Sequence, residues 1–275
     1  MGNNTTLKCA ELISEVRSKK PLVHHITNYV TVNDCANIVL AIGASPIMAD
    51  DIGEVEDIVS ISSVLVINIG TLNSRTINSM IAAGKKANEL KIPVVLDPVG
   101  AGASPLRNDT VNKLISEIKF SVIRGNMSEI RFISGLHAST RGVDASEADV
   151  KGTESGIQVA EELAEKLKCV VAITGAVDYV SDGIRTVSIK NGHPMLSSVT
   201  GTGCMCTSLI GSFCGATRDY FLGAVSGISS MGIAGETAFE KAGDMGTSSF
   251  RTALIDSISK LDSRYFESRS KIDEI

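Results

Sequence analysis

The sequence predicts an α/β protein in which a mostly parallel central sheet is flanked by helices. Three observations predict this fold class. Short runs that are apolar at nearly every position alternate with longer segments whose apolar residues recur at helical spacing. Each apolar run ends in a polar residue or a glycine, and no linker interrupts the alternation. Such an order is typical of a layered sheet with right-handed crossovers.

The predicted elements follow one another along the chain. The expected buried strands are VLVINIG (64–70), IPVVLDP (92–98), FSVIRGN (120–126) and CVVAITG (169–175). The expected helices among them span 73–91, 105–119 and 153–168, each with a charged outer face. VDYVSDGIRTVSI (177–189) predicts a hairpin that turns at Asp182-Gly183, and therefore an antiparallel edge to the sheet. From residue 203 onward the chain is expected to be mainly helical.

Composition limits the possible functions. The 275 residues are 43% hydrophobic and 21% charged, and no repeat divides them, so we expect one domain over residues 1–275. The net charge of −5 and the lack of a basic stripe argue against a nucleic-acid partner. No apolar run reaches the length of a membrane span, and the N-terminus lacks the apolar core of a secretory signal. The six cysteines form no C-x-x-C pair, so we expect no zinc site and a cytoplasmic location.

Polar residues stand where the expected strands end. In parallel sheets, ligands bind beyond the carboxyl ends of the strands, so these residues are the first candidates for a site. They are Asn68, Gly70, Asp97, Arg124, Asn126, Thr174 and Gly175. Asp97 and Glu129, with the Asn126 amide, offer the oxygen ligands that Mg²⁺ prefers. Taken singly, Asp97 could be a turn residue, Glu129 a helix-capping partner of Asn126, and Arg124 a surface ion pair.

A glycine turn precedes a long apolar segment at SSVTGTGCMCTSLIGSF (197–213). The turn lacks the lysine and the spacing of a P-loop. No charged residue occurs from 199 to 217, so the helix is expected to be buried. The N-terminus of such a helix favours a phosphate, because free N–H groups and the positive end of the dipole point out of it. Cys204 stands at this junction, either as a thiol whose pKa the helix lowers or as a small packed residue.

Several motifs together resemble the hydroxyethylthiazole kinase family of thiamine biosynthesis, within the ribokinase-like group. The resemblance runs from about residue 10 to the final helices. The motifs that carry it are PLVHHITNYVTVNDCANIVLAIGASPIMADD (21–51), LDPVGAGAS (96–104), RGNMSEI (124–130), AITGAVDYVSDG (172–183) and TGTGCMC (200–206). The resemblance implies a three-layer ribokinase-like fold. It also implies ATP-dependent phosphorylation of 4-methyl-5-(2-hydroxyethyl)thiazole, a requirement for Mg²⁺, and a homotrimer with active sites at its subunit interfaces.

The resemblance also assigns roles by position. It places the thiazole beside Met48, with Asn28, Val30, Gly70 and Gly201 as further substrate-binding residues. ATP is assigned to Arg124, Thr174, Thr202 and Asn126, and the metal to Asp97 and Glu129. The segment from Gly201 to Cys204 forms the anion hole, with Gly203 and Cys204 as the catalytic pair. The wider group mostly has aspartate where Cys204 stands, whereas cysteine is usual in the thiazole kinases.

Other interpretations stay open. The same fold could phosphorylate hydroxymethylpyrimidine or pyridoxal, or the chain could be a non-catalytic nucleotide or thiazole sensor. A cysteine-nucleophile enzyme would need a histidine beside Cys204, and none of His24, His25, His137 and His193 lies in a recognisable partner motif. His24 and His25 adjoin in an expected strand and so face opposite ways, which suits a structural or interfacial role. The residues expected to be ordinary core cysteines are Cys35, Cys169 and Cys214.

Overall fold

A computed structural model describes residues 4–135 and 153–275. Within this part of the chain, nine strands form one sheet in the order β2-β1-β3-β4-β5-β6-β7-β8-β9. The strands are β1 (Leu22–Ile26), β2 (Ser45–Met48), β3 (Val64–Asn68), β4 (Val94–Asp97), β5 (Val122–Asn126), β6 (Val170–Thr174), β7 (Asp178–Ser181), β8 (Thr186–Ile189) and β9 (Ile272–Glu274). Strands β1 to β6 pair in parallel, and β7, β8 and β9 continue the sheet with antiparallel pairing.

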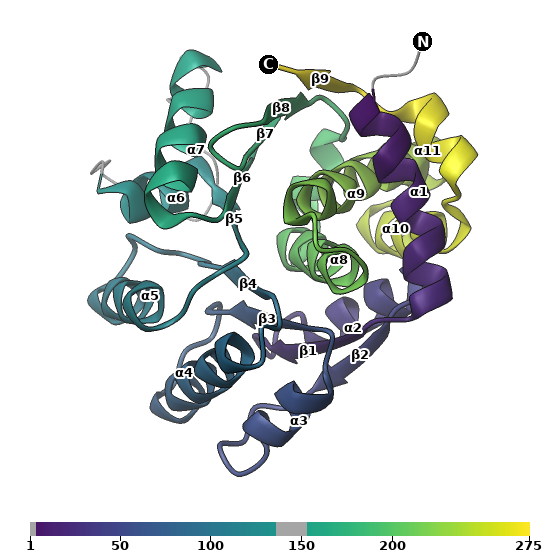
Figure 1. The fold of residues 1–275 in the computed structure, drawn as a ribbon. Helices are drawn as coiled ribbons and strands as arrows, with labels where there is room; N and C mark the ends of the chain where they lie inside the picture. The colour runs from purple at the N-terminus through teal and green to yellow at the C-terminus, as the bar shows by residue number, and fades with distance from the viewer. Residues whose placement is uncertain (1–3, 136–152) are drawn as a thin grey trace.

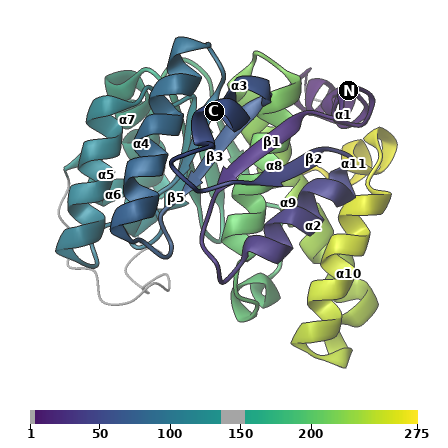
Figure 2. The same cartoon turned by 90° about the horizontal axis from the view of Figure 1, so that it is seen from below.

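Helices cover both faces of the sheet and make three layers (Figures 1 and 2). One face carries α3 (Val55–Ile61), α4 (Ser74–Glu89), α5 (Pro105–Glu117), α6 (Met127–Ser134) and α7 (Thr153–Leu167). The other carries α1 (Asn4–Lys19), α2 (Val32–Ile42), α8 (Thr202–Ala216), α9 (Tyr220–Ala242), α10 (Thr247–Lys260) and α11 (Ser263–Arg269). Two short 3₁₀ helices, η2 (Pro194–Ser198) and η3 (Gly243–Met245), complete the described elements. None of the helices described here is both long and apolar enough to cross a membrane.

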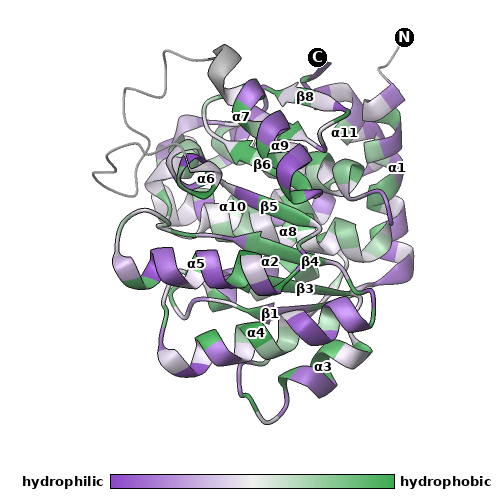
Figure 3. Ribbon diagram, turned by 60° about the vertical axis from the view of Figure 1, so that its left-hand side comes forward, coloured by the Kyte–Doolittle hydropathy of each residue, from purple (hydrophilic) through white to green (hydrophobic). Residues whose placement is uncertain are grey.

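The central strands are largely hydrophobic along their length (Figure 3), and their apolar side chains are buried on both faces of the sheet. In β3, Val64 and Val66 belong to the core under α8 and α9, whereas Leu65 and Ile67 belong to the core under the opposite helices. Strands β1, β4, β5 and β6 divide their buried apolar side chains in the same way, whereas the residues of the edge strand β2 are only half-buried. This two-sided burial explains why the strands lack an alternation of apolar and polar residues.

Helix α8 runs through the interior of its layer. It packs against α9 on one side and against β1, β3 and β4 on the other. Every residue from Met205 to Cys214 is buried, in agreement with the absence of charge in this segment. The N-terminus of α8 is therefore fixed in direction by packing along its whole length.

The predicted elements are largely confirmed. All four expected strands and the three expected helices are present, with ends shifted by a few residues. The hairpin is β7 and β8, and Gly183 adopts φ +85° at its turn. Two strands were not expected: β2, where the SPIM motif stands, and β9, which ends an otherwise helical segment by pairing with β8. Both are short edge strands, for which the local sequence gives little signal.

Candidate active site

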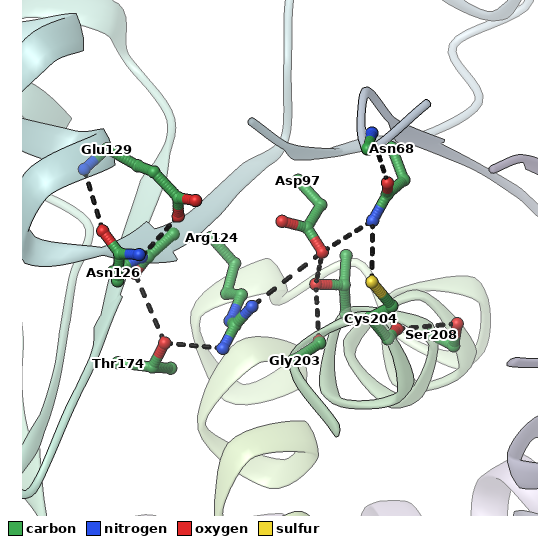
Figure 4. Close-up of polar contacts among 12 residues, drawn as sticks. Asn68, Asp97, Arg124, Asn126, Glu129, Thr174, Gly203, Cys204 and Ser208 are labelled. Carbon is green, nitrogen blue, oxygen red and sulfur yellow. Dashed lines mark hydrogen bonds and ion pairs between the residues drawn. The ribbon is translucent and has the colours of Figure 1, made fainter. Parts of the chain in front are cut away.

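Polar side chains from four neighbouring strands converge at one edge of the sheet (Figure 4). Asn68 ends β3 and lies opposite Asp97, which ends β4. Arg124 lies in β5, and Asn126 at the end of β5 is opposite Thr174 at the end of β6. Because these strands are parallel neighbours, the polar residues predicted near their ends lie side by side in the structure, and their role as a site stays a prediction.

Asp97 lies at the centre of this cluster. Its side chain is buried, and its Oδ2 accepts hydrogen bonds from Asn68 Nδ2 at 2.9 Å and Thr207 Oγ1 at 2.8 Å. The guanidinium of Arg124 approaches the same oxygen at 3.9 Å. Oδ1 is equally buried but has no hydrogen-bond partner among the described residues. Burial raises the pKa of Asp97, while Arg124, Thr207 and Asn68 counteract part of that rise.

Arg124 connects the strand ends to helix α8. Its side chain is only 13% exposed, so it is not the surface ion pair that it could have been. Its Nη2 donates to Thr174 Oγ1 at 2.6 Å. A Cβ atom at Gly203 would lie 2.8 Å from Nη1 of Arg124. Glycine at position 203 thus lets the guanidinium lie against the first turn of α8.

Helix α8 begins without a side-chain cap. Gly201 precedes it with φ +85°, and no side chain bonds to its first N–H groups. By contrast, α4 and α6 are capped by Asn73 and Asn126. A Cβ at Gly201 would lie 2.6 Å from Thr31 Cγ2, so both the backbone conformation and the space require glycine. The uncapped N–H groups and the helix dipole make this turn suitable for an anion.

Cys204 lies in the first turn of α8 and faces two amides. Its Sγ accepts hydrogen bonds from Asn28 Nδ2 and Asn68 Nδ2, each at 3.3 Å. The pKa of Cys204 is raised, first by burial and then by the charge of Asp97, although these amides and Thr31 favour the thiolate. The expectation that the helix N-terminus lowers this pKa was wrong. Desolvation and a carboxylate in the same cluster outweigh the helix dipole.

The described histidines do not pair with Cys204. His25 shares a hydrogen bond with Ser208 Oγ at 3.1 Å, and His24 with the carbonyl oxygen of Ala49 at 2.8 Å. His193 accepts from the backbone of Met195, and His137 lies outside the described residues. No described histidine therefore shares a hydrogen bond with the thiol, and both His24 and His25 are buried with hydrogen-bond partners of their own. The expected core cysteines, Cys35, Cys169 and Cys214, are all buried.

Asn126 and Glu129 form a reciprocal cap at the start of α6. Asn126 Oδ1 accepts from the Glu129 N–H at 2.9 Å, and Glu129 Oε2 accepts from the Asn126 N–H at 2.8 Å. Glu129 Oε1 accepts from the Gly100 N–H at 2.8 Å, which ties the loop after β4 to the site. Burial, and then the charge of Asp97, raise the pKa of Glu129. The capping interpretation of Glu129 is therefore observed, and it brings the carboxyl group close to Asp97.

The residues expected to bind substrate fall into two groups. Met48 lines a hollow of about 310 Å³ together with His25, Thr27 and Tyr29. Val30 adjoins this hollow and is 57% exposed.

The second group adjoins Cys204. Asn28 donates to Cys204 Sγ, and the Gly70 N–H donates to Asn68 Oδ1 at 2.9 Å. A Cβ at Gly70 would lie 2.9 Å from Asn28 Nδ2. The segment 27–30 links the two groups because its residues are consecutive in the chain.

Sequence reasoning missed three residues of the cluster. Thr207 bonds Asp97 from α8, and its position one turn after Cys204 was the available signal. Arg107 donates to the carbonyl oxygens of Ile69, Gly70 and Val99 and so holds two loops together. Asp178 accepts from the Gly175 N–H at 2.8 Å, and burial raises its pKa to about 7. Only the fold brings Arg107 and Asp178 to this edge.

Comparison with known proteins gives the family. The model of the hydroxyethylthiazole kinase family matches residues 13–264. The chain belongs to this kinase family. A hydroxyethylthiazole kinase from Clostridium beijerinckii is 67% identical over 276 residues, covering 100% of both chains. The resemblance seen in the sequence motifs is therefore confirmed over the full length.

Solved structures agree with this family and with its fold. A hydroxyethylthiazole kinase from Pyrococcus horikoshii OT3 superposes with a TM-score of 0.88 at 38% identity, covering 98% of this chain and 99% of that one. A ribokinase-like superfamily protein from Enterococcus faecalis V583 superposes with a TM-score of 0.60 at 11% identity, covering 94% of this chain and 83% of that one. The second likeness bears on the fold alone. The predicted three-layer ribokinase-like fold is confirmed.

Proposed function

We propose that this kinase transfers the γ-phosphoryl group of ATP to the hydroxyl of 4-methyl-5-(2-hydroxyethyl)thiazole. The product is the thiazole phosphate used in the synthesis or salvage of thiamine phosphate. Family membership supports the substrate class. One observation carries the chemistry: the uncapped N-terminus of α8 meets Arg124 and the buried Asp97 at the carboxyl edge of the sheet.

Catalysis of phosphoryl transfer depends mainly on how the two reactants are positioned and on how the charge of the transferred group is stabilised. The alcohol oxygen forms a bond to the γ-phosphorus while the bond from that phosphorus to the oxygen of ADP breaks. Charge on the transferred group is then met by the N–H groups of Thr202, Gly203 and Cys204, and by the guanidinium of Arg124. The proton of the alcohol passes to Cys204 Sγ when it is a thiolate, or to solvent. Because burial raises the pKa of Cys204, it is a weak base.

The ATP side of the site is assigned to β5 and β6. Arg124 and Thr174 are joined by a hydrogen bond and present a cation and a hydroxyl at adjacent strand ends. The hydroxyl of Thr202 donates to the carbonyl oxygen of Leu196, so Thr202 contributes through its backbone. Asn126 is committed to capping α6 and contributes by positioning that helix.

Mg²⁺ is proposed at Asp97 and Glu129. The fit rests on Asp97 Oδ1, a buried carboxylate oxygen without a hydrogen-bond partner among the described residues. Glu129 keeps lone pairs beyond its two backbone bonds, and it lies close enough to Asp97 for the charge of Asp97 to raise the pKa of Glu129. The described residues hold no group of three or more metal-ligating side chains. Two carboxylates suit Mg²⁺, because this ion usually takes one or two carboxylates together with waters and phosphates. When bound, the ion would neutralise charge on the phosphates of ATP.

The thiazole ring is assigned to the hollow beside Met48. This hollow combines the thioether with the flat face of Tyr29 and with polar groups of Thr27 and His25. Methionine packs favourably against aromatic rings and adapts to their shape. From this hollow the hydroxyethyl arm can extend past Asn28 toward Cys204, because Asn28 stands between Thr27 and Tyr29 of the hollow in the chain and donates to Cys204 Sγ.

A homotrimer with active sites at its interfaces is part of this proposal. Apolar side chains are exposed just after the edge strand β2 and its neighbour β1: Tyr29 is 78%, Val30 57% and Ile52 52% exposed, and Tyr29 lines the Met48 hollow. Burying them against another subunit would also close the open side of the hollow. Sedimentation analysis of the parent and of an Ile52→Arg variant tests this, with Ile184→Arg as control, since Ile184 is exposed at the distant β7–β8 turn. An active monomeric parent contradicts the trimer.

We also propose that the chain acts as one domain in the cytoplasm. Its two ends meet, because Thr5 Oγ1 donates to Glu274 Oε1 at 2.6 Å and β9 joins the same sheet. All six cysteines are free, as expected in a reducing compartment. A single cooperative unfolding transition supports one domain, and two separate transitions contradict it.

A panel of alcohols tests the proposed substrate. ATP-dependent phosphorylation of hydroxyethylthiazole, hydroxymethylpyrimidine and pyridoxal is measured with Mg²⁺ for the parent and a Met48→Ala variant. We expect the thiazole to have the highest kcat/KM, and Met48→Ala to lower that value mainly through KM. A higher kcat/KM for either other alcohol would change the substrate. Binding of ATP without transfer to any of them would favour the sensor interpretation.

A further inference from the structure

A second hollow lies at the opposite edge of the sheet from the active site. Its volume is about 690 Å³, and it is lined by residues around the amino ends of β4, β5 and β6. Lys91, Lys119 and Lys168 stand just before these three strands. Because the strands are parallel neighbours, about 4.8 Å apart, the three lysines meet at one edge. No function described above uses this edge.

The positive charges of the hollow exceed its negative charges. Arg218 and Arg185 add to the three lysines, whereas the lining carboxylates are Asp182 and Asp219. Both of these carboxylates are bound to Arg185, each at 2.8 Å.

The other four cations have no ion-pair partner among the described residues. Within residues 4–135 and 153–275, no carboxylate lies within 4.0 Å of the charged groups of Lys91, Lys119, Lys168 or Arg218. Four cations that no described carboxylate pairs with therefore gather around one hollow of a chain whose net charge is −5.

The backbone that carries these cations is held in place. Asn88 Oδ1 accepts from the Lys119 N–H at 2.7 Å, and Asn88 Nδ2 donates to the Lys119 carbonyl oxygen at 2.9 Å. Arg218 Nη1 donates to the carbonyl oxygen of Lys91 at 3.0 Å. Lys91 and Lys168 both adopt left-handed backbone conformations, with φ of +58° and +54°. Such conformations are uncommon for residues other than glycine.

Aromatic side chains form part of the wall. Phe120, Tyr220 and Phe221 line the hollow. Phe120 and Phe221 are buried, and the Arg185 guanidinium lies 4.3 Å from the centre of the Phe221 ring, so Tyr220 is the partly exposed ring of this wall. The volume falls within the range of small-molecule sites. The hollow thus offers cations for an anion and, at Tyr220, one aromatic side chain for a ring.

We propose that this hollow binds a small organic di- or triphosphate. Several unpaired cations around one space favour a ligand with more than one negative charge, because each phosphate can then meet a cation through a charge-assisted hydrogen bond. The partly exposed Tyr220 can pack against a ring attached to the phosphates. Nucleotides and other ring-bearing diphosphates share this chemistry.

Calorimetric titration with inorganic pyrophosphate at about 0.15 M salt tests the site. The parent is compared with a Lys119→Gln/Lys168→Gln variant and with a matched Lys20→Gln/Lys85→Gln variant. Lys20 has the same left-handed backbone, φ +47°, but does not line the hollow. We expect the first variant to weaken binding roughly tenfold to a hundredfold, since charged hydrogen bonds are lost, and the control to bind as the parent does. Equal binding by the parent and both variants overturns the proposal.

The active site is also expected to bind phosphates, so an Arg124→Gln variant separates the two sites. Pyrophosphate binding that persists in Arg124→Gln and is lost in Lys119→Gln/Lys168→Gln supports the proposal. Binding lost in Arg124→Gln and retained in the double variant places the anion at the active site alone and overturns it. ADP is titrated in the Arg124→Gln variant as a second probe. Tighter binding of ADP than of pyrophosphate identifies a ring-bearing ligand, and equal binding identifies recognition of the phosphates alone.

Discussion

Replacing Cys204 with alanine tests how much the thiol contributes to catalysis. The structure puts Sγ between the amides of Asn28 and Asn68, close to the carboxylate of Asp97. Removing the sulfur leaves both amides with other partners, because Asn28 Nδ2 also donates to Asn68 Oδ1, and Asn68 Nδ2 to Asp97 Oδ2. We therefore expect Cys204→Ala to fold with the same site geometry.

The expected loss of activity follows from the protonation state of the thiol. A positioned general base contributes about 10²–10⁴-fold. A thiol with an ordinary pKa of about 8.5 is only roughly a tenth ionised at pH 7.5, and the raised pKa of Cys204 lowers that fraction further. The uncapped helix and Arg124 remain in the variant. We expect kcat to fall about tenfold and at most about a hundredfold.

The assay is the dependence of kcat on pH, from about pH 6.5 to about pH 9.5. A base acts only when it is deprotonated, so a raised pKa means that kcat of the parent keeps rising with pH across this range. Cys204→Ala and Cys204→Ser should lose this rise, because neither side chain ionises there. Cys169→Ala, which removes a buried thiol at the opposite edge, is the control and should keep the rise.

Two results would refute this reasoning. A loss of more than about 10⁴-fold in Cys204→Ala, with ATP and thiazole still bound, would make the thiol essential. A parent whose kcat does not change with pH would remove Cys204 from proton transfer. In Cys204→Asp, a carboxylate can accept the same two amide hydrogen bonds and is ionised near neutral pH, so kcat should equal or exceed that of the parent. Repulsion by Asp97 or by the phosphate would instead appear as a lower kcat.

Three further changes test the rest of the site. Asp97→Asn keeps the shape of a buried side chain but removes the proposed metal ligand. We expect kcat to fall at least a hundredfold at saturating Mg²⁺ while the melting temperature stays within a few degrees. Full activity would remove Asp97 from the reaction. Gly203→Ala places a Cβ 2.8 Å from Arg124 Nη1, so KM for ATP should rise about tenfold or more, and an unchanged KM would separate Arg124 from ATP. Burial raises the pKa of Asp178 to about 7, so its folded form holds a proton that the unfolded chain releases near pH 4. The free energy of unfolding should therefore fall as pH rises from about 4 to about 7, and urea titrations of Asp178→Asn should show a shallower fall; an equal slope would contradict the raised pKa.

The sequence predicted those features of the fold that leave a pattern in consecutive residues, namely the buried strands, their ends and the start of α8. The strand ends at Asn68, Asp97, Arg124 and Thr174 could be found because each follows a continuous apolar run. A parallel sheet then brings such ends to one edge without any knowledge of side-chain contacts. The start of α8 was found in the same way, from a glycine turn before an uncharged segment.

The electrostatics of the site could not be predicted from the sequence. The pKa of Cys204 depends on burial and on Asp97, which is 107 positions away in the chain and joins it only in the folded protein. Arg107 resembles any other exposed helical arginine in the sequence, yet it bonds three carbonyl oxygens of two loops. The strands β2 and β9 were missed because edge strands are specified by their neighbours rather than by their own residues.

The central claim is that phosphoryl transfer to the thiazole alcohol takes place where α8 meets Asp97 and Arg124. Phosphorus NMR of a mixture of ATP, Mg²⁺ and hydroxyethylthiazole measures it directly, because a phosphate ester and inorganic phosphate give separate signals. We predict that the parent converts the γ-phosphate signal into that of the thiazole ester, and that Asp97→Asn under the same conditions forms the ester at least a hundredfold more slowly. Formation of inorganic phosphate alone, or ester formation at the parental rate by a folded Asp97→Asn variant, would contradict the account.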